Sequence, residues 1–182
     1  LIMKFLKTTI PDLILIEPLI HKDYRGYFFE SYRHDLLEQK LGYEVNFVQD
    51  NETKSTKGVL RGLHFQLPPF DQCKLCRVIE GSVLDVAVDL RKDSTTFGKH
   101  LAVELTGDNK RQLFIPKGFA HGYLTLSETA TFFYKVDNYF SPESQKGIVF
   151  DDDFLSIDWK LLHKDIHLSS YDKCNLNFSD YF

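Results

Sequence analysis

The sequence has little cysteine and no long hydrophobic run. Its 182 residues include three cysteines, an odd number in a chain long enough to build a core without disulfides, which favours reduced thiols and a cytoplasmic protein. The longest aliphatic run near the start, residues 13–16, is far shorter than the roughly 18 apolar residues of a membrane span, and Pro11 and Asp12 interrupt any signal-peptide core. We therefore expect no membrane partner.

An excess of basic residues is also missing. The chain has 22 Lys and Arg residues against 26 Asp and Glu residues, a net charge of −4, and the scattered basic residues argue against nucleic acid as a partner. No repeat or linker divides the sequence, so we expect one domain over residues 1–182. Residues 160–182 are expected to form a mostly irregular C-terminal cover. Met3 resembles a natural start, so Leu1 and Ile2 are expected to be an added remnant.

Strand patterns dominate the rest of the chain. One helix is predicted over residues 32–41, where Ser31 can cap the start and Gly42 can end it. Residues 75–90 are typical of two strands that the Gly81 turn joins as a hairpin. Further short strands are predicted at residues 101–105, 112–115, 122–126 and 131–136. This regular spacing is typical of an all-β sandwich or barrel.

The second strand of the expected hairpin has two different faces. Branched aliphatic residues occupy one face from Leu84 to Leu90, whereas Asp85 and Asp89 alternate with small residues on the other. Such a strand suits a barrel whose interior is partly polar.

Arg61 and His64 are polar residues in an otherwise apolar strand. Burying such groups is costly unless each finds a partner or has a task. Strict alternation would place them on opposite faces, so both reach one cavity only if Gly62 marks a bulge or twist. The alternative is a hydrogen-bonded core histidine and an arginine at the rim.

His121 follows a Pro-x-Gly turn, as does a histidine of cupin barrels that is often a metal ligand. The first cupin stretch should contain two histidines and a glutamate, but here His64 is followed by Gln66 where the second histidine should be. We therefore expect no catalytic metal. Cys73 and Cys76 have the spacing of a zinc or redox pair, but no second pair exists and residues three apart on a strand point to opposite faces. We expect them to be structural.

Seven segments together resemble the dTDP-4-dehydrorhamnose 3,5-epimerases, from about Phe5 to Asp172. They are residues 23–31, 47–51, 58–66, 72–75, 85–91, 112–122 and 138–142. The resemblance implies a cupin-like jelly-roll β-barrel with a few short helices. It also implies a cofactor-independent epimerase that inverts C3 and C5 of a 6-deoxy sugar whose C4 is a ketone, with a dTDP-linked sugar as substrate.

The resemblance also implies roles for individual residues. His64 is the base, Tyr134 the proton donor and Lys74 a cation beside the sugar oxygen, while Asp172 orients the base histidine. From their own sequence context, Tyr134 would be a packing residue and Lys74 a solvated edge lysine. The substrate-binding positions implied by the resemblance are Arg25, Glu30, Gln49, Asn51, Arg61, Lys74 and His121, and Asp85 is expected to hold His121.

Three residues depart from the family pattern. Tyr171 stands where lysine is frequent, Gln145 where an acidic residue is common and Phe140 where tyrosine is frequent. The nucleotide base and the exact sugar are therefore less constrained than the reaction class. The alternatives are a 3-epimerase, a 3,4-ketoisomerase acting on a dTDP- or GDP-linked sugar, a non-catalytic sugar-binding cupin and a metal-dependent cupin.

The resemblance further implies a homodimer that exchanges N-terminal strands. The segment from Lys4 to Glu17 is apolar on both strand faces, which suits such an exchange.

Overall fold

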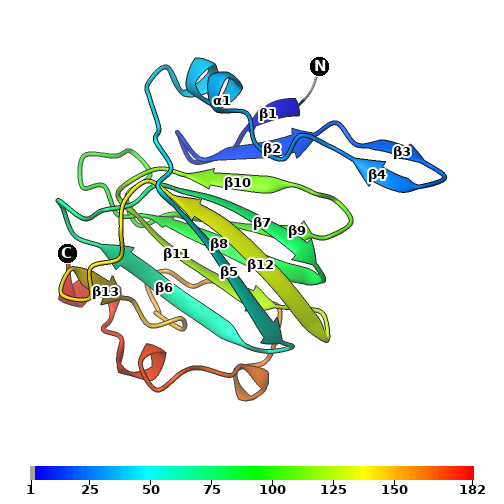
Figure 1. Cartoon of the computed structure of the whole chain (residues 1–182). Coiled ribbons are helices and arrows are strands. Elements are labelled where there is room, and N and C mark those ends of the chain that lie inside the picture. Colours follow the sequence, from blue (N-terminus) through cyan, green and yellow to red (C-terminus); the bar gives the residue numbers. More distant parts are fainter. Residues whose placement is uncertain (1–2) are drawn as a thin grey trace.

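Two antiparallel sheets face each other in the computed structural model, which describes residues 3–182 (Figure 1). The expectation for Leu1 and Ile2 lies outside the described residues. The elements, in chain order, are β1 (Met3–Lys7), β2 (Ile14–Pro18), β3 (His21–Asp23), β4 (Gly26–Phe28), α1 (His34–Leu41), β5 (Gln49–Thr56), β6 (Leu60–Gln66), β7 (Lys74–Glu80), β8 (Ser82–Asp89), β9 (His100–Thr106), β10 (Gln112–Ile115), β11 (Phe119–Thr125), β12 (Thr129–Val136), β13 (Gln145–Gly147) and the 3₁₀ turns η1 (His163–Asp165), η2 (Asp172–Cys174) and η3 (Phe178–Asp180).

The sheets have six and five strands. Their orders are β1-β2-β10-β7-β12-β5 and β13-β6-β11-β8-β9, and β3 and β4 form a separate hairpin. This architecture confirms the predicted all-β fold. None of the helices in residues 3–182 has the length and apolar character needed to cross a bilayer.

Apolar side chains from both sheets fill the space between them, among them Val78, Leu105, Leu113 and Phe132. A second cluster lies outside the five-stranded sheet, where the aliphatic face of β8 packs against the C-terminal segment through residues such as Trp159. The two predicted faces of β8 are thereby confirmed. Because its aliphatic face is covered from outside, the face that carries Asp85 turns toward the interior.

The predicted hairpin between residues 75 and 90 is wrong, although both strands exist. β7 pairs with β10 and β12, whereas β8 pairs with β9 and β11 in the other sheet. Gly81, with φ +81°, leads the chain from one sheet to the other, and a Cβ there would lie 2.1 Å from the Thr129 carbonyl oxygen. Alternation reveals which way side chains point but not which strand is the neighbour, so the sequence pattern could not separate the two arrangements.

The helix starts at His34 rather than at residue 32 and ends at Leu41 as predicted, with Gly42 as its C-cap at φ +78°. Ser31 does not cap it; the cap position is Arg33, whose side chain makes no cap bond. Ser31 lies two residues before the cap position, and its carbonyl oxygen accepts a hydrogen bond from Gln112 Nε2 at 2.7 Å. This bond ties the segment before the helix to β10.

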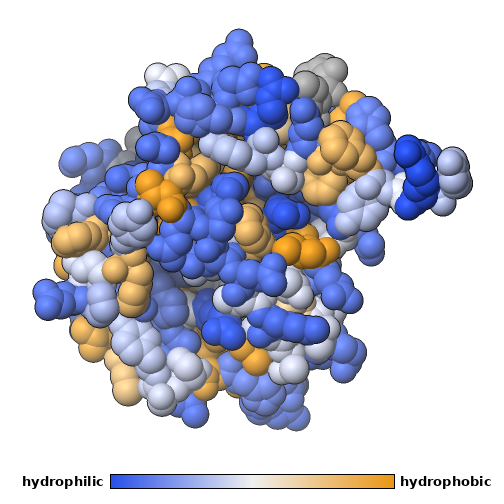
Figure 2. All heavy atoms as spheres, viewed as in Figure 1, coloured by the Kyte–Doolittle hydropathy of each residue, from blue (hydrophilic) through white to orange (hydrophobic). Residues whose placement is uncertain are grey.

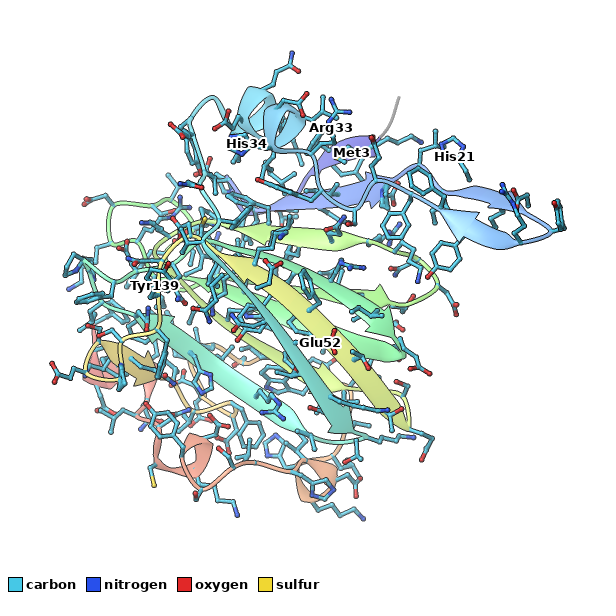
Figure 3. The ribbon with its side chains drawn as sticks, viewed as in Figure 1. Met3, His21, Arg33, His34, Glu52 and Tyr139 are labelled. Carbon is cyan, nitrogen blue, oxygen red and sulfur yellow. The ribbon has the colours of Figure 1, made fainter. Side chains whose placement is uncertain are left out.

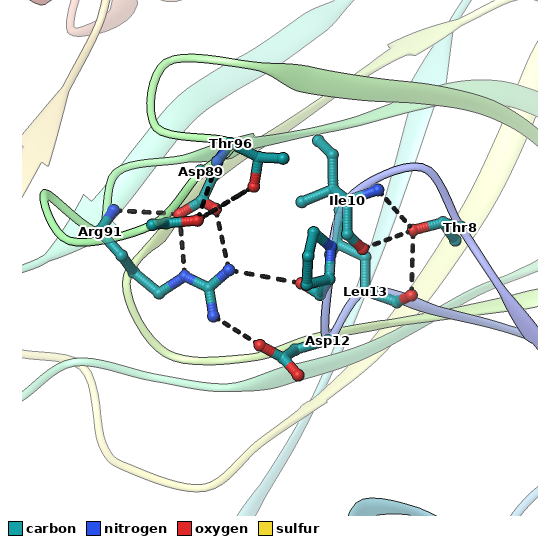
Figure 4. Close-up of polar contacts among 9 residues, drawn as sticks. Thr8, Ile10, Asp12, Leu13, Asp89, Arg91 and Thr96 are labelled. Carbon is teal, nitrogen blue, oxygen red and sulfur yellow. Dashed lines mark hydrogen bonds and ion pairs between the residues drawn. The ribbon is translucent and has the colours of Figure 1, made fainter.

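A polar network anchors the β1–β2 loop to the end of β8 (Figure 4). Arg91 donates to Asp12 and to Asp89, both at 2.8 Å, and the Thr96 hydroxyl donates to Asp89 at 2.7 Å. Burial opposes ionisation of Asp89, but the hydrogen bonds from Arg91, Ser94 and Thr96 outweigh it and lower its pKa to about 2. Asp89 is therefore a structural carboxylate.

The β3–β4 hairpin projects from the body of the molecule (Figure 1). His21 on this hairpin and Tyr139 lie on opposite sides of the molecule (Figure 3). The hairpin exposes Tyr24 at 96% and Phe28 at 66% of their surface, whereas hydrophobic residues elsewhere on the same face are scattered among hydrophilic ones (Figure 2).

A bulge in β6 brings Arg61 and His64 to the same side of the sheet. His64 lies opposite His121 and Arg61 opposite Tyr123, so a step of three residues on β6 matches a step of two on β11. Gly62 allows this, with φ +125° and with Gly122 Cα only 2.5 Å from where a Cβ would stand. The bulge at Gly62, which is the condition for Arg61 and His64 to share a cavity, is therefore present.

Gly62→Ala is expected to lower the free energy of unfolding by about 2–4 kcal/mol, because alanine would be strained at this φ and would overlap β11. Urea unfolding measures the loss. Gly42→Ala is the control, because Gly42 also has positive φ but open space around it, and should cost only about 1 kcal/mol. Equal losses for the two variants would contradict the steric role of Gly62.

Candidate active site

Two adjoining cavities open between the sheets. The outer cavity has a volume of about 540 Å³ and the inner one about 480 Å³. His64, Lys74 and Tyr134 line both, so the two spaces form one cleft. The outer cavity is also lined by Gln49, Asn51, Leu67, Gln72, Phe140, Gln145 and Phe182. The inner cavity is also lined by Thr53, Arg61, His121, Tyr123, Phe132, Tyr171 and Asp172.

The three shared residues come from opposing sheets. His64 lies on β6 in the five-stranded sheet, whereas Lys74 begins β7 and Tyr134 lies on β12 in the six-stranded sheet. Their strands are paired, and Lys74 and Tyr134 lie two register positions apart. A molecule in the cleft therefore meets an imidazole from one sheet and a phenol and an ammonium from the other.

His64 is paired with Asp172 from the C-terminal segment, at 2.5 Å between Nε2 and Oδ1. Ser169 holds the carboxylate in place, because its hydroxyl donates to Asp172 Oδ2 at 2.8 Å and accepts from the Asp172 backbone N–H at 3.0 Å. Burial favours the protonated acid, but the hydrogen bonds from His64 and Ser169 outweigh it, so the pKa of Asp172 lies below its ordinary value.

An ionised Asp172 determines the histidine tautomer. A carboxylate only accepts hydrogen bonds, so the proton on His64 belongs on Nε2, and this assignment follows from the hydrogen bond. Nδ1 of a neutral His64 then carries a lone pair and can accept a proton. The dyad thus has the arrangement of a general base with an orienting acid.

Tyr134 is suited to giving up a proton rather than to removing one. Burial, followed by the neighbouring Cys76 and Tyr123, raises the pKa of its phenol above the ordinary 10.0, whereas Arg61 lowers it. The phenol is therefore protonated at neutral pH. It can therefore donate a proton into the cleft that His64 also lines.

Lys74 places its amino group in the cleft. Burial lowers the pKa of its ammonium, and Cys76 and Asp85 nearby oppose the shift. No ion pair engages Lys74 within residues 3–182. In its protonated form, this side chain is free to stabilise an oxygen that becomes negative in the cavity.

His121 contacts Asp85, as expected, with 3.0 Å between Nε2 and Oδ1. Both side chains are buried, with exposed fractions of 7% and 0%. Burial lowers the pKa of His121, partly offset by Asp85. His121 is therefore a neutral imidazole at pH 7 that lines the inner cavity.

The remaining substrate-binding expectations divide into two groups. Gln49 and Asn51 line the outer cavity and are hydrogen-bonded to each other at 2.7 Å, and Arg61 lines the inner cavity, where it donates to Ser55. Arg25 and Glu30 line neither cavity. Arg25 lies on the projecting hairpin, paired with Asp23 at 2.5 Å, and Glu30 faces Arg33 at 3.5 Å.

Several residues that line the cleft were missed at the level of sequence. Tyr123 stacks on Phe132 with 4.2 Å between ring centroids and shares a 2.6 Å hydrogen bond with Thr53. Alternation could have found these two aromatics, because they share strand faces with His121 and Tyr134. No sequence signal placed Phe182, at the C-terminus, on the outer cavity.

A family model described as dTDP-4-dehydrorhamnose 3,5-epimerase matches residues 7–180. The chain belongs to this epimerase family. The dTDP-4-dehydrorhamnose 3,5-epimerase of Pseudomonas aeruginosa is 48% identical over 178 residues, which cover 98% of this chain and 97% of that protein. The resemblance inferred from the sequence segments is therefore confirmed.

Solved structures of dTDP-4-dehydrorhamnose 3,5-epimerase family members have the same fold. The enzyme from Elizabethkingia anophelis is 49% identical, with a TM-score of 0.95 over 98% of both chains. A dTDP-6-deoxy-D-glucose-3,5-epimerase from Legionella pneumophila, in complex with dTDP-4-keto-L-rhamnose, is 47% identical, with a TM-score of 0.93 over 97% of this chain and 93% of that one. The expected cupin-like jelly-roll is thus confirmed.

The His64–Asp172 pair is expected to make stability depend on pH. Because the folded pKa of Asp172 is lowered, its stabilisation is present above the ordinary value of 3.8 and is lost as the pH falls through the lower folded value. Asp172→Asn should therefore cost about 1–3 kcal/mol at pH 7, and the difference from the unchanged protein should shrink toward pH 3.

Urea unfolding at both pH values checks this. Asp158→Asn serves as a control, because Asp158 pairs with Lys160 at the exposed surface and such pairs contribute little. A cost for Asp172→Asn that stays constant with pH would show that the carboxylate charge is not what stabilises the fold.

Proposed function

We propose that the chain catalyses the 3,5-epimerisation of dTDP-4-dehydro-6-deoxy-D-glucose to dTDP-4-dehydro-L-rhamnose. The observation that carries the proposal is that His64 and Tyr134 reach the same cleft from opposing sheets. The bound dTDP-4-keto-L-rhamnose in the Legionella pneumophila relative supports the substrate class. The steps below follow from the side chains of the cleft.

The chemistry depends on the ketone at C4. Hydrogens at C3 and C5 are acidic because the electron pair left by their removal spreads onto O4 as an enolate. Inversion requires a base on one face of the ring, a proton donor on the other and positive charge near O4. One proton leaves and one returns at each carbon, so the balanced reaction needs no redox cofactor.

Each of these requirements has a residue in the cleft. His64 Nδ1 takes the proton from carbon, and the resulting imidazolium is stabilised by Asp172. The C–H electron pair moves onto O4, beside the Lys74 ammonium. Tyr134 then donates its phenolic proton to the opposite face of the same carbon. Proton return from His64 to Tyr134 through solvent restores the enzyme before the second carbon reacts.

The outer cavity is proposed to hold the nucleotide. Gln49 and Asn51 offer amide donors to phosphate oxygens, and the rings of Phe140 and Phe182 offer apolar surface to a base. Gln145 lines the same cavity and replaces an acidic residue common in the family. We propose that the base is thymine; a preference for a GDP-linked sugar would contradict this.

We also propose a homodimer in which each β3–β4 hairpin crosses to the other copy. The hairpin carries exposed Tyr24 and Phe28, and it holds Arg25 away from the cleft of its own chain. If a second copy covered these aromatic side chains, Arg25 would lie at the cleft of that copy. Its guanidinium could there bind the diphosphate of the nucleotide sugar. The strand exchange expected for Lys4 to Glu17 is thus proposed to include this hairpin, which follows β1 and β2 in the chain.

Incubation with the dTDP-linked 4-keto sugar in D₂O should place deuterium at both C3 and C5, as NMR of the product measures. His64→Ala should lower exchange and inversion by about 10²–10⁴. Tyr134→Phe should lower inversion by a similar factor but exchange by less, because the base remains and can return solvent deuterium to the face it deprotonated.

The controls are Tyr181→Phe and His100→Ala, which change the same residue types outside the cleft and should leave the rates unaltered. Deuterium at C3 alone would indicate a 3-epimerase, and a ketone moved to C3 would indicate a 3,4-ketoisomerase. Absent exchange with a melting temperature still raised by dTDP would indicate a sugar-binding protein.

The dimer proposal predicts a mass in solution of about twice the 21.2 kDa of one chain. It also predicts complementation between two impaired variants. A heterodimer of Arg25→Ala and His64→Ala chains should regain about half of the normal activity, because one of its two clefts then contains both native residues. A monomer, or a mixture no more active than its parts, would contradict the exchange of the hairpin.

A further inference from the structure

Three buried side chains from both sheets converge beside the inner cavity: Cys76 from β7, Asp85 from β8 and His121 from β11. Their ligand atoms all lie within 4.8 Å of one another. His121 Nε2 is 3.0 Å from Asp85 Oδ1 and 3.9 Å from Cys76 Sγ. The proposed epimerisation uses Asp85 only to hold His121 and gives Cys76 no role.

One carboxylate oxygen in this cluster lacks a partner. Asp85 is fully buried, and its Oδ2 accepts no hydrogen bond from any of residues 3–182. An unpaired buried carboxylate oxygen costs free energy, which a bound cation would offset. The neighbouring donors are a sulfur and a ring nitrogen, so the cation they favour is a borderline-soft transition metal rather than magnesium or calcium.

The spacing also suits tetrahedral coordination. Zinc binds sulfur at about 2.3 Å and nitrogen or oxygen at about 2.0–2.2 Å, which places tetrahedral ligand atoms roughly 3.3–3.7 Å apart. The observed 3.0 and 3.9 Å lie within a few tenths of an ångström of that range. The third pair, Cys76 and Asp85, lies within 4.8 Å, so side-chain rotations that bring these two ligand atoms together would complete three corners of a tetrahedron.

We propose that Cys76, Asp85 and His121 form a zinc site that inhibits the enzyme. Three protein ligands leave the fourth position for water or an inhibitor, as in open zinc sites. The site adjoins the reaction cleft: His121 lines the inner cavity, and Cys76 lies opposite Tyr134 in the strand register. Zinc would engage the imidazole that faces the sugar and place a divalent charge beside the proton donor.

The binding arm of the test is independent of the proposed reaction. After dialysis against EDTA, the protein is titrated with Co²⁺ and with Zn²⁺. We expect one site per chain and, with Co²⁺, a thiolate-to-metal charge-transfer band that Zn²⁺ removes. Cys76→Ser and Cys76→Ala should each lose the band, whereas Cys73→Ser and Cys174→Ser should retain it.

The two control cysteines test whether a different thiol binds the metal. Cys73 is buried in a different cluster, and Cys174 is exposed. A band that depends on Cys174 would assign the metal to the surface and overturn the proposal, as would the absence of a thiolate band in the unchanged protein. Melting curves of the Cys76 variants check that each is folded.

The activity arm measures inhibition of each variant relative to its own zinc-free rate. Zinc should inhibit the unchanged enzyme, and EDTA should reverse the inhibition. Replacing Cys76 should raise the half-inhibitory zinc concentration by about tenfold or more. Equal zinc sensitivity with and without Cys76 would overturn the inhibitory role, whereas an inactive protein that still binds cobalt through Cys76 would contradict only the proposed reaction.

Discussion

The His64–Asp172 hydrogen bond joins residues 108 positions apart in the sequence, and the arrangement of the cleft depends on it. It attaches the C-terminal segment to β6, assigns the histidine proton to Nε2 and leaves Nδ1 free. Ser169 orients the carboxylate from within the same segment. The irregular C-terminal segment therefore helps to set the geometry of the cleft, because without it β6 would present a histidine of undetermined tautomer.

The need to pair buried polar groups, which the His64–Asp172 bond meets, also applies to the rest of the interior. Titratable groups between two apolar sheets are tolerated when each is paired or has a task. His121 is paired with Asp85 and Arg61 with Ser55, while Lys74 faces the open cleft. Within residues 3–182, Oδ2 of Asp85 is buried without a hydrogen-bond partner, and this carboxylate lies beside Cys76 and His121, where we propose the zinc site. Polar pairing thus gives the cleft its chemistry, while the surrounding aromatic rings give it shape.

Sequence reasoning succeeded where a local pattern carries the information. The two faces of β8, the strands after residue 100, the left-handed Gly42 and the bulge at Gly62 follow from alternation or from glycine's freedom at positive φ. Sequence reasoning failed where the structure depends on which segments of the chain lie side by side. The helix begins two residues later than expected, so Ser31 does not cap it, and the expected hairpin is a crossing between sheets.

For the cleft, the amino-acid order was enough to predict the family and the all-β fold, because linked segments in order are specific, and it pointed to the residues that we propose carry the chemistry. Which of these residues share one cavity became clear only from the folded chain. Side-chain direction along a strand is local, whereas pairing between strands is set by packing across the whole sheet. That is why His64, Lys74 and Tyr134 meet although they lie on three strands, and why Arg25, from an equally good sequence match, lies outside the cleft of its own chain.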